Sequence, residues 1–335
     1  MSTVTVAVDA GGADRGPREV AAGAAEAVRN GIRVILFGDA SAIGSVPQGV
    51  EVRDAPVSIA KEADPVAAVR STPEASVVQA ARAVSSGEAD AFVSGGSTGS
   101  ALAAGVLHIR RQRGISRPAL ALMVPVPGAP VLFLDVGAST EVRADRLVQH
   151  AHLGSAWAAT ALGIDSPRVA LLSNGEEPTR GTPAVVEANA LLSEDSNLRF
   201  IGNIEGVGVA SGQADVVVTD GFTGNVALKL MEGVSGALIE AIRGAASSDA
   251  RAAAGALLMR PALSGLRSQL DPEEHGGALM LGLRSVGVVP HGRFSSRGFA
   301  RAIEVAADAV RSDAINRTHS ALESAGVLRT PARPD

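Results

Sequence analysis

The sequence predicts an α/β fold of three layers, α/β/α, in which helices cover both faces of a mostly parallel sheet. Short apolar runs alternate with Ala-rich helical patterns along most of the 335 residues. Many of these runs are continuously apolar, as parallel strands are when both faces of the sheet are covered. Hydrophobic residues make up 46% of the chain and aromatic residues only 2%, so Ala, Val, Leu and Ile must fill the core.

Strands and helices are expected in alternating order. Apolar runs predict strands at residues 3–8, 34–37, 91–94, 119–124, 131–135, 169–173, 199–204, 216–219 and 286–290. Helical patterns lie between most of them, at residues 18–30, 101–113, 145–162, 183–192, 226–243 and 296–315. Such sheets bind ligands at the carboxyl ends of their strands, which we expect to share one rim.

Residues 235–275 interrupt this alternation. Ala-rich helical sequence runs into GALLMRPALSGLRSQLDPEEHGG, where Pro261 should kink or break the helix. One apolar stripe at helical spacing consists of Met259, Leu263, Leu266 and Leu270. This pattern predicts a projecting helical hairpin, whose stripe packs against the chain's own core or a dimer partner, or contacts a membrane surface or an acyl chain. We therefore expect a catalytic core at 1–234, the hairpin at 235–275, a return to the core at 276–325 and a disordered tail at 326–335.

Composition disfavours several classes of protein. The net charge is −5 without a long basic run, which disfavours binding to nucleic acid. The absence of Cys excludes disulfides, thiolate metal sites and a cysteine nucleophile. No stretch approaches the roughly 18 apolar residues that a membrane-spanning helix needs, and the N-terminus does not resemble a signal peptide. A cytoplasmic protein is expected.

Two stretches of the chain repeat one another. SGEADAFVSGGSTGS begins at Ser86 and SGQADVVVTDGFTGN at Ser211, and they are identical at 8 of 15 positions. In each, a strand leads through a glycine turn into a helix start, where backbone N–H groups, a Thr hydroxyl and the positive end of the helix dipole favour an anion. We call residues 96–100 the first turn and residues 221–225 the second turn. We expect both to line one cleft and to hold phosphate between them.

The candidate site residues follow predicted strands. Candidate phosphate- or substrate-binding residues are Asp9, Gly11, Gly12, Asp14, Gly96, Ser97, Thr98, Gly99, Asp135, Glu176, Glu177, Arg180, Gly221, Thr223 and Gly224. Candidate catalytic residues are Asp220, Asn225, Lys229 and His291. Lys229 lies one helical turn after Asn225 and could reach the anion, or it could be an ordinary solvated lysine. His291 follows an apolar strand and could be a general acid, a hydrogen-bond donor or a structural histidine.

Known cofactor motifs do not account for the two turns. The chain has no P-loop sequence, its best dinucleotide-type glycine spacing is one residue too long, and its histidines have no metal-ligand spacing. We therefore expect neither a cofactor nor a metal.

The motifs together resemble one known family. They are VAVDAGGADRGP, GEADAFVSGGSTGSAL, RPALALMVPV, LDVGAS, LGIDSPRVALLSNGEEPTRG, FIGNIEG, ADVVVTDGFTGNVALK, GGALMLGL and HG. In this order the series resembles the bacterial phosphate acyltransferases of the PlsX type, acyl-[acyl carrier protein]:phosphate acyltransferases of phospholipid synthesis. The family usually has Asn where Ser97 stands and Lys where Arg180 stands.

The resemblance implies a fold like that of isocitrate dehydrogenases and phosphotransacetylases. It also implies that the chain transfers a fatty acyl group from acyl carrier protein to inorganic phosphate. A basic dock for the acidic carrier could lie at Arg110, Arg111, Arg113 and Arg117. We further expect a homodimer with loose membrane contact. The alternatives are a phosphotransacetylase-like enzyme that uses another acyl donor, or a non-catalytic acyl-binding or membrane scaffold of the same fold.

Overall fold

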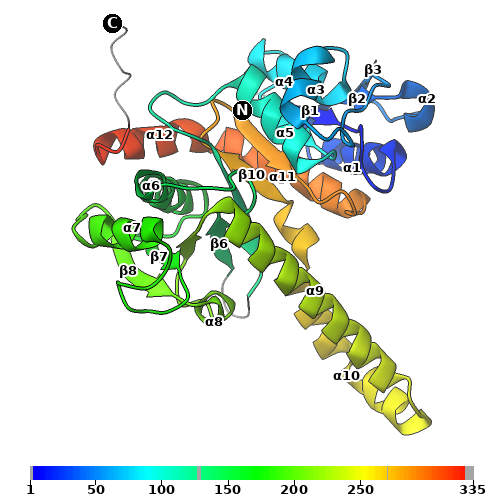
Figure 1. Cartoon of the computed structure of the whole chain (residues 1–335). Helices are drawn as coiled ribbons and strands as arrows, with labels where there is room; N and C mark the ends of the chain where they lie inside the picture. Colours follow the sequence, from blue (N-terminus) through cyan, green and yellow to red (C-terminus); the bar gives the residue numbers. More distant parts are fainter. Residues whose placement is uncertain (1–2, 127–129, 270, 329–335) are drawn as a thin grey trace, which may run out of the picture.

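The computed structural model describes residues 3–126, 130–269 and 271–328, with the side chains of 261–269 excepted (Figure 1). The strands are β1 (Thr5–Asp9), β2 (Arg33–Gly38), β3 (Val50–Asp54), β4 (Ala91–Ser94), β5 (Ala119–Val124), β6 (Val131–Leu134), β7 (Arg168–Leu172), β8 (Arg199–Ile204), β9 (Val216–Val218), β10 (Ala278–Leu281) and β11 (Val286–Val289). The longer helices are α1 (Pro17–Arg29), α4 (Ser76–Ser85), α6 (Ala144–Ala161), α7 (Pro183–Ser193), α9 (Gly221–Ala246), α10 (Ala250–Gln269), α11 (Ser296–Arg311) and α12 (Ala314–Ser324). The shorter helices are α2 (Ala40–Ile43), α3 (Pro65–Ser71), α5 (Thr98–Ala104), η1 (Gly105–Ile109), α8 (Gly206–Ala210) and η2 (Pro272–His275).

The predicted three-layer arrangement is confirmed. One hydrophobic cluster joins one face of the sheet to α1, α6, α7, α11 and α12, and a second joins the other face to α3, α4, α5 and the first turns of α9. Small residues let the helices approach closely: a Cβ at Gly154 of α6 would stand 2.6 Å from Val216 Cγ1 of β9. Two strands were not predicted. In β3 every residue after Val50 is at least partly exposed, and β10 is a four-residue strand.

The direction of the strands reverses in the middle of the sheet. Their order is β3-β2-β1-β4-β11-β10-β5-β6-β9-β7-β8. Strand β10 is antiparallel to both neighbours, and β5 is antiparallel to β6. As a result, β1, β4 and β11 run one way, whereas β6, β9 and β7 run the other way. The prediction that all carboxyl ends share one rim is therefore wrong, because hydrophobic periodicity carries no information on strand direction.

Twist compensates for much of this reversal. Adjacent strands rotate by roughly 20 to 25°, so the five steps from β4 to β9 accumulate roughly 100 to 125°. This rotation turns the carboxyl ends of β6 and β9 most of the way back toward those of β4 and β11. The same five steps correspond to about 24 Å along the sheet. The two halves can thus face one space although the two turns are not neighbours in the sheet.

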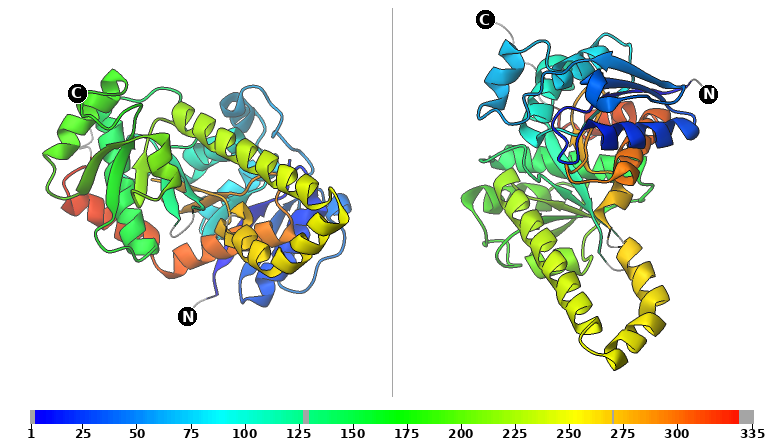
Figure 2. Two further views of the ribbon diagram at one scale, coloured as in Figure 1. Left: turned by 90° about the horizontal axis from the view of Figure 1, so that it is seen from below. Right: turned by 90° about the vertical axis from the view of Figure 1, so that its right-hand side faces the viewer.

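Helices α9 and α10 project together from the body of the protein (Figures 1 and 2). Helix α9 begins within the second turn and continues to Ala246, so one helix crosses the expected boundary between 234 and 235. The division of the chain into core and insertion stays a prediction. Helix α10 continues through Pro261, so the expected break there is wrong. Leu257, Leu258 and Met259 are 67%, 83% and 57% exposed and do not pack against the core.

Two residues of the expected tail belong to the packed part of the chain. Val327 and Leu328 pack against the core, and the Val327 carbonyl accepts a hydrogen bond from Gln149 Nε2 at 3.2 Å. Residues 329–335 lie outside the described residues, as does Leu270 of the predicted stripe.

Candidate anion-binding site

Asp9 is a buried residue that fixes the backbone packed against the first turn. It ends β1 and is fully buried. Its carboxylate accepts hydrogen bonds from Ser76 Oγ at 2.6 Å, Ser94 Oγ at 2.7 Å and Gly11 N at 2.8 Å. Burial raises the pKa of Asp9 to about 6, although the hydrogen bonds act in the opposite direction. Asp9 therefore holds the chain around Gly11 in place and offers no exposed carboxylate to a substrate, in contrast to the prediction.

Close packing fixes the glycines of the first turn. A Cβ at Gly96 would stand 2.9 Å from the Gly11 carbonyl oxygen, and one at Gly12 would stand 2.3 Å from Ala60 Cβ. Gly12 also has a φ of 95°, which strongly favours glycine. The segment around Ala60 was not predicted to lie here. It covers the turn, and the Ile59 carbonyl accepts a hydrogen bond from Ser100 Oγ at 3.1 Å.

The first turn keeps donors available at the start of α5. Ser97 caps this helix, because its Oγ accepts a hydrogen bond from Ser100 N at 3.2 Å. Thr98 and Gly99 are exposed, and their N–H groups donate to no acceptor in the described part of the chain. These donors can bind an anionic or polar group.

Asp135 supports the second turn in the same way. It is fully buried and follows β6 directly. Its carboxylate accepts hydrogen bonds from Leu120 N, Gly137 N, Ala138 N and Ser139 Oγ at 2.8 to 3.1 Å. Ser139 Oγ in turn accepts from Gly221 N at 3.2 Å. A Cβ at Gly224 would stand 1.9 Å from the Asp135 carbonyl oxygen, so only glycine fits there. Each turn thus rests on a buried aspartate, and Ser76 and Ser139 are the supporting residues that sequence reasoning missed.

Asp220 is the N-cap of α9. Its carboxylate accepts hydrogen bonds from Thr223 N at 2.8 Å and Thr223 Oγ1 at 2.7 Å. The predicted anion-binding N–H group of Thr223 is therefore occupied by a side chain of the protein itself. This geometry makes Asp220 a helix cap, and it does not support the predicted catalytic role. The exposed Asn225 lies beside Gly137, with its Oδ1 3.9 Å from a Cβ placed there.

His291 and Lys229 connect the two halves of the sheet. His291 follows β11 and is partly buried, and Arg293 N donates to its Nδ1 at 3.2 Å. The neutral ring therefore carries its proton on Nε2. Burial lowers the pKa of His291, and the charge of Lys229 lowers it further, while Glu232 and Asp14 act in the opposite direction. Lys229 itself pairs with Glu232 at 2.8 Å. The charged residues of α9 thus stand close to the end of β11.

Glu176, Glu177 and Arg180 stay apart from the two turns. They are exposed in the loop after β7, where Arg180 Nε lies 3.5 Å from Glu177 Oε2. Asn203 Nδ2 fixes this loop by donating to the Glu177 carbonyl at 2.9 Å. Among the described residues, no hydrogen bond joins this loop to either turn.

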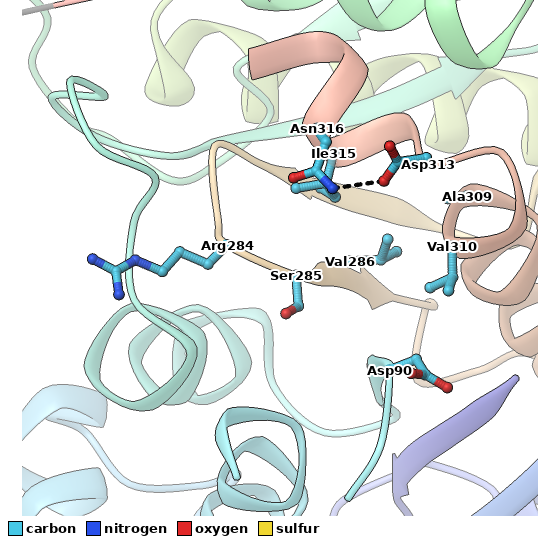
Figure 3. Close-up of a pocket in the computed structure, with 9 residues that line it drawn as sticks. All are labelled: Asp90, Arg284, Ser285, Val286, Ala309, Val310, Asp313, Ile315 and Asn316. Atoms are coloured by element: carbon cyan, nitrogen blue, oxygen red, sulfur yellow. Dashed lines mark hydrogen bonds between the residues drawn. The ribbon is translucent and has the colours of Figure 1, made fainter. Parts of the chain in front are cut away.

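Two hollows lie elsewhere on the surface. One of about 140 Å³ lies at the amino ends of β4 and β11, with the Asn316 Nδ2 to Asp313 Oδ1 hydrogen bond beside it (Figure 3). Because His291 follows the carboxyl end of β11, this hollow is not part of the candidate site. The other, of about 490 Å³, is lined by Arg110, Arg111, Arg113 and Arg284, and it includes three of the arginines of the expected carrier dock.

No metal site or membrane-spanning helix is found in the described chain. Among residues 3–126, 130–269 and 271–328, no group of three or more His, Asp or Glu side chains could hold a metal ion. None of the helices in these segments combines the length and apolar character needed to cross a membrane.

The overall fold has counterparts among solved structures. A phosphotransacetylase from Streptococcus pyogenes aligns with a TM-score of 0.60 and 17% identity over 92% of this chain and 94% of the other. The EutD phosphotransacetylase from Staphylococcus aureus aligns with a TM-score of 0.58 and 18% identity over the same shares. The protein is therefore an α/β protein of the phosphotransacetylase fold.

Sequence similarity identifies the family more closely. A family model described as fatty acid synthesis protein matches residues 4–317. Proteins named phosphate acyltransferase are similar along nearly the whole chain. The one from Desulfitobacterium hafniense (strain Y51) is 39% identical over 315 residues, which cover 92% of this chain and 94% of the relative. The one from Thermobifida fusca (strain YX) is 40% identical over 336 residues, which cover 98% and 93%. The chain belongs to this family, and the predicted resemblance is confirmed.

Proposed function

We propose that the protein is a phosphate acyltransferase that transfers a fatty acyl group from acyl carrier protein to inorganic phosphate. The product is an acyl phosphate for phospholipid synthesis. Membership of the family supports the reaction type. The site supports it most directly through one observation: the charge of Lys229, on the helix that starts at the second turn, lowers the pKa of His291 after β11.

The proposed chemistry is a direct displacement. A phosphate oxygen attacks the thioester carbonyl carbon, the new C–O bond forms, and the C–S bond breaks to release the thiolate of the carrier. Phosphate is already an anionic nucleophile, so no serine or cysteine intermediate is needed. The ammonium of Lys229 and the amide of Asn225 stabilise the developing oxyanion. His291 donates a hydrogen bond from Nε2–H to the leaving sulfur, and the proton that the thiolate takes up is the one that hydrogenphosphate loses as it becomes the acyl phosphate.

The placement of phosphate needs revision from the sequence-based expectation. Each turn packs around its own buried aspartate, and about 24 Å of sheet separates β4 from β9. We propose that phosphate binds near the second turn and Lys229. The open N–H groups of Thr98 and Gly99 then serve the other substrate.

An assay with purified carrier thioester and phosphate tests the function. Formation of acyl phosphate and free carrier thiol is the expected result. Product from acetyl-coenzyme A but not from the fatty acyl carrier would favour the phosphotransacetylase-like alternative. Tight acyl binding without turnover would favour the non-catalytic scaffold.

We further propose a homodimer that contacts membranes loosely. An exposed apolar row runs along α9 and consists of Val226, Leu230, Val234, Leu238 and Ile242. It suits the equivalent helix of a second copy. The exposed residues 257–259 in the middle of α10 suit lipid, where a poorly soluble acyl phosphate would be released. One short amphipathic segment gives only marginal, reversible anchoring.

A further inference from the structure

Three arginines gather at the start of α6, and of these only Arg117 was assigned above, to the expected carrier dock. Arg143 is the N-cap of α6, and Arg146 lies in its first turn. Arg117 precedes β5 in the chain. Burial lowers the pKa of Arg146, and the charges of Arg117 and Arg143 lower it further. Arg143 and Arg146 thus share the first turn of α6, and the charge of Arg117 acts on Arg146 as well.

Most of this positive charge is not balanced by carboxylates. Arg143 pairs with Asp145 at 2.9 Å. For Arg117 and Arg146, the described residues provide no carboxylate within 4.0 Å, and Arg146 Nε is buried without a hydrogen-bond partner. Cations at a helix N-terminus also oppose the helix dipole. A bound phosphate would offset both the repulsion among the arginines and their unfavourable interaction with the helix dipole, because it is negatively charged. Its oxygens can also accept the two parallel N–H donors that a guanidinium presents.

A buried histidine links Arg117 to the start of α6. His150 follows Arg146 by one helical turn and is 2% exposed. Burial lowers the pKa of His150 and so does the charge of Arg146, whereas the charge of Asp135 and a hydrogen bond to the Arg117 backbone act in the opposite direction. Gln149 beside it accepts hydrogen bonds from Ser116 N at 2.8 Å and Ser116 Oγ at 2.9 Å. The segment that carries Arg117 therefore packs against the first two turns of α6.

The cluster and the second turn share one buried support. Asp135 accepts a hydrogen bond from Leu120 N in β5, which begins two residues after Arg117. It also accepts from Ser139 Oγ, which is bonded to Gly221 N at the start of α9. Only four residues separate Ser139 from Arg143. The arginines and the start of α9 therefore surround the same part of the sheet.

We propose that Arg117, Arg143 and Arg146 form a phosphate-binding subsite next to the second turn. The phosphate is either the inorganic substrate or the phosphodiester in the pantetheine arm of the carrier. The choice between these sources rests on the proposed function, whereas the affinity for phosphate rests on the cluster itself. Arg110, Arg111 and Arg113 line a different hollow and are not part of this subsite.

Binding of inorganic phosphate is tested without any acyl donor. The thermal midpoint of the full-length protein is measured with phosphate and with chloride at matched ionic strength. Phosphate should raise the midpoint of the wild type and of Arg29→Gln, an exposed control on α1. The increase should be lost in Arg117→Gln and Arg146→Gln and partly retained in Arg146→Lys, which keeps the charge. If both glutamine variants keep the wild-type increase, the subsite for free phosphate is wrong.

Kinetics then identifies the source of the phosphate. If Arg146→Gln raises the KM for phosphate about tenfold or more, with the carrier KM unchanged, the subsite binds the inorganic substrate. If only the carrier KM rises, it binds the pantetheine phosphodiester. If neither the KM for phosphate nor the KM for the carrier changes in Arg146→Gln or in Arg117→Gln, the proposal is wrong. If the wild type is inactive but its stabilisation by phosphate depends on these arginines, the subsite stands and the proposed function fails.

Discussion

Asp9 and Asp135 show how a buried carboxylate can organise a site without touching its ligand. Both are fully buried at the end of a strand, and both accept a hydrogen bond from the N–H group two residues later. Asp9 also accepts hydrogen bonds from the hydroxyls of Ser76 and Ser94, and Asp135 accepts one from the hydroxyl of Ser139. Removing either carboxylate should therefore move a whole turn.

Asp9 also makes a definite contribution to the pH dependence of stability. Its pKa is about 6 in the folded protein and 3.8 in the reference state, so the folded protein binds more protons between these values. The stability that Asp9 contributes is present below about pH 3.8 and is lost as the pH rises through 6, by up to roughly 3 kcal/mol. The free energy of unfolding of the wild type minus that of Asp9→Asn should fall between pH 4.5 and 7 in urea titrations.

Asp39→Asn is the matched control for this measurement. Its own hydrogen bonds, led by that from Ser41, lower the pKa of the exposed Asp39, so any contribution has the opposite sign. It is lost as the pH falls. A wild-type minus Asp9→Asn difference that stays flat would contradict the prediction for Asp9.

The second prediction at this scale concerns the oxyanion. Lys229→Ala and Asn225→Ala should each lower kcat by roughly 10²-fold, the scale found for oxyanion donors, because both act on charge that develops in the transition state. Steady-state assays with acyl carrier protein and phosphate measure this, and circular dichroism checks the fold. Near wild-type rates in both variants would leave Lys229 as a surface lysine that only pairs with Glu232.

At the scale of elements, α9 has two different environments along its length. Its start is fixed by glycines packed on Asp135, and its remainder is exposed in the single chain. An exposed apolar face on a helix that leaves the core is costly in water unless another surface covers it. Helix α10, which projects beside α9 (Figure 2), adds the exposed residues 257–259 in its middle.

The double variant Leu257→Glu and Leu258→Glu tests the membrane role of these exposed residues. Two carboxylates on this apolar segment should abolish sedimentation with anionic vesicles, because the lost apolar burial and the added repulsion both oppose binding. Activity with soluble substrates should persist, since the segment is remote from Asp135 and His291. Arg251→Gln is the control for headgroup attraction alone. If the double variant binds vesicles as the wild type does, the leucines do not contact lipid, and packing against another protein surface is the better explanation of their exposure.

At the scale of the whole molecule, the reversed sheet decides where substrates can meet. Five inter-strand steps lie between β4, which leads into the first turn, and β9, which leads into the second, and the usual twist of a sheet would turn their ends toward one space. The charge of Lys229 lowers the pKa of His291, so the two halves are linked electrostatically.

A crystal structure with phosphate or sulfate tests this arrangement. We expect the anion near the second turn, within hydrogen-bond reach of Lys229 or the arginines of α6, and away from the N–H groups of Thr98 and Gly99. An anion bound by both turns at once would show that the cleft is far narrower than the strand order indicates. It would restore the sequence-based expectation of one shared phosphate.

The sequence by itself determined the alternation of strands and helices, the two anion-type turns and the family. These follow from local patterns: apolar runs, helix-start chemistry and the motif TDGFTGNVALK do not depend on distant contacts. Only the tertiary structure decided that β10 and β5 reverse the sheet, that Asp9 and Asp135 are buried supports, and that Asp220 caps its own helix. The tertiary structure also brought Arg117 near the arginines at the start of α6. Strand direction, burial and the neighbours of a charge depend on residues far apart in the chain, which local periodicity does not record.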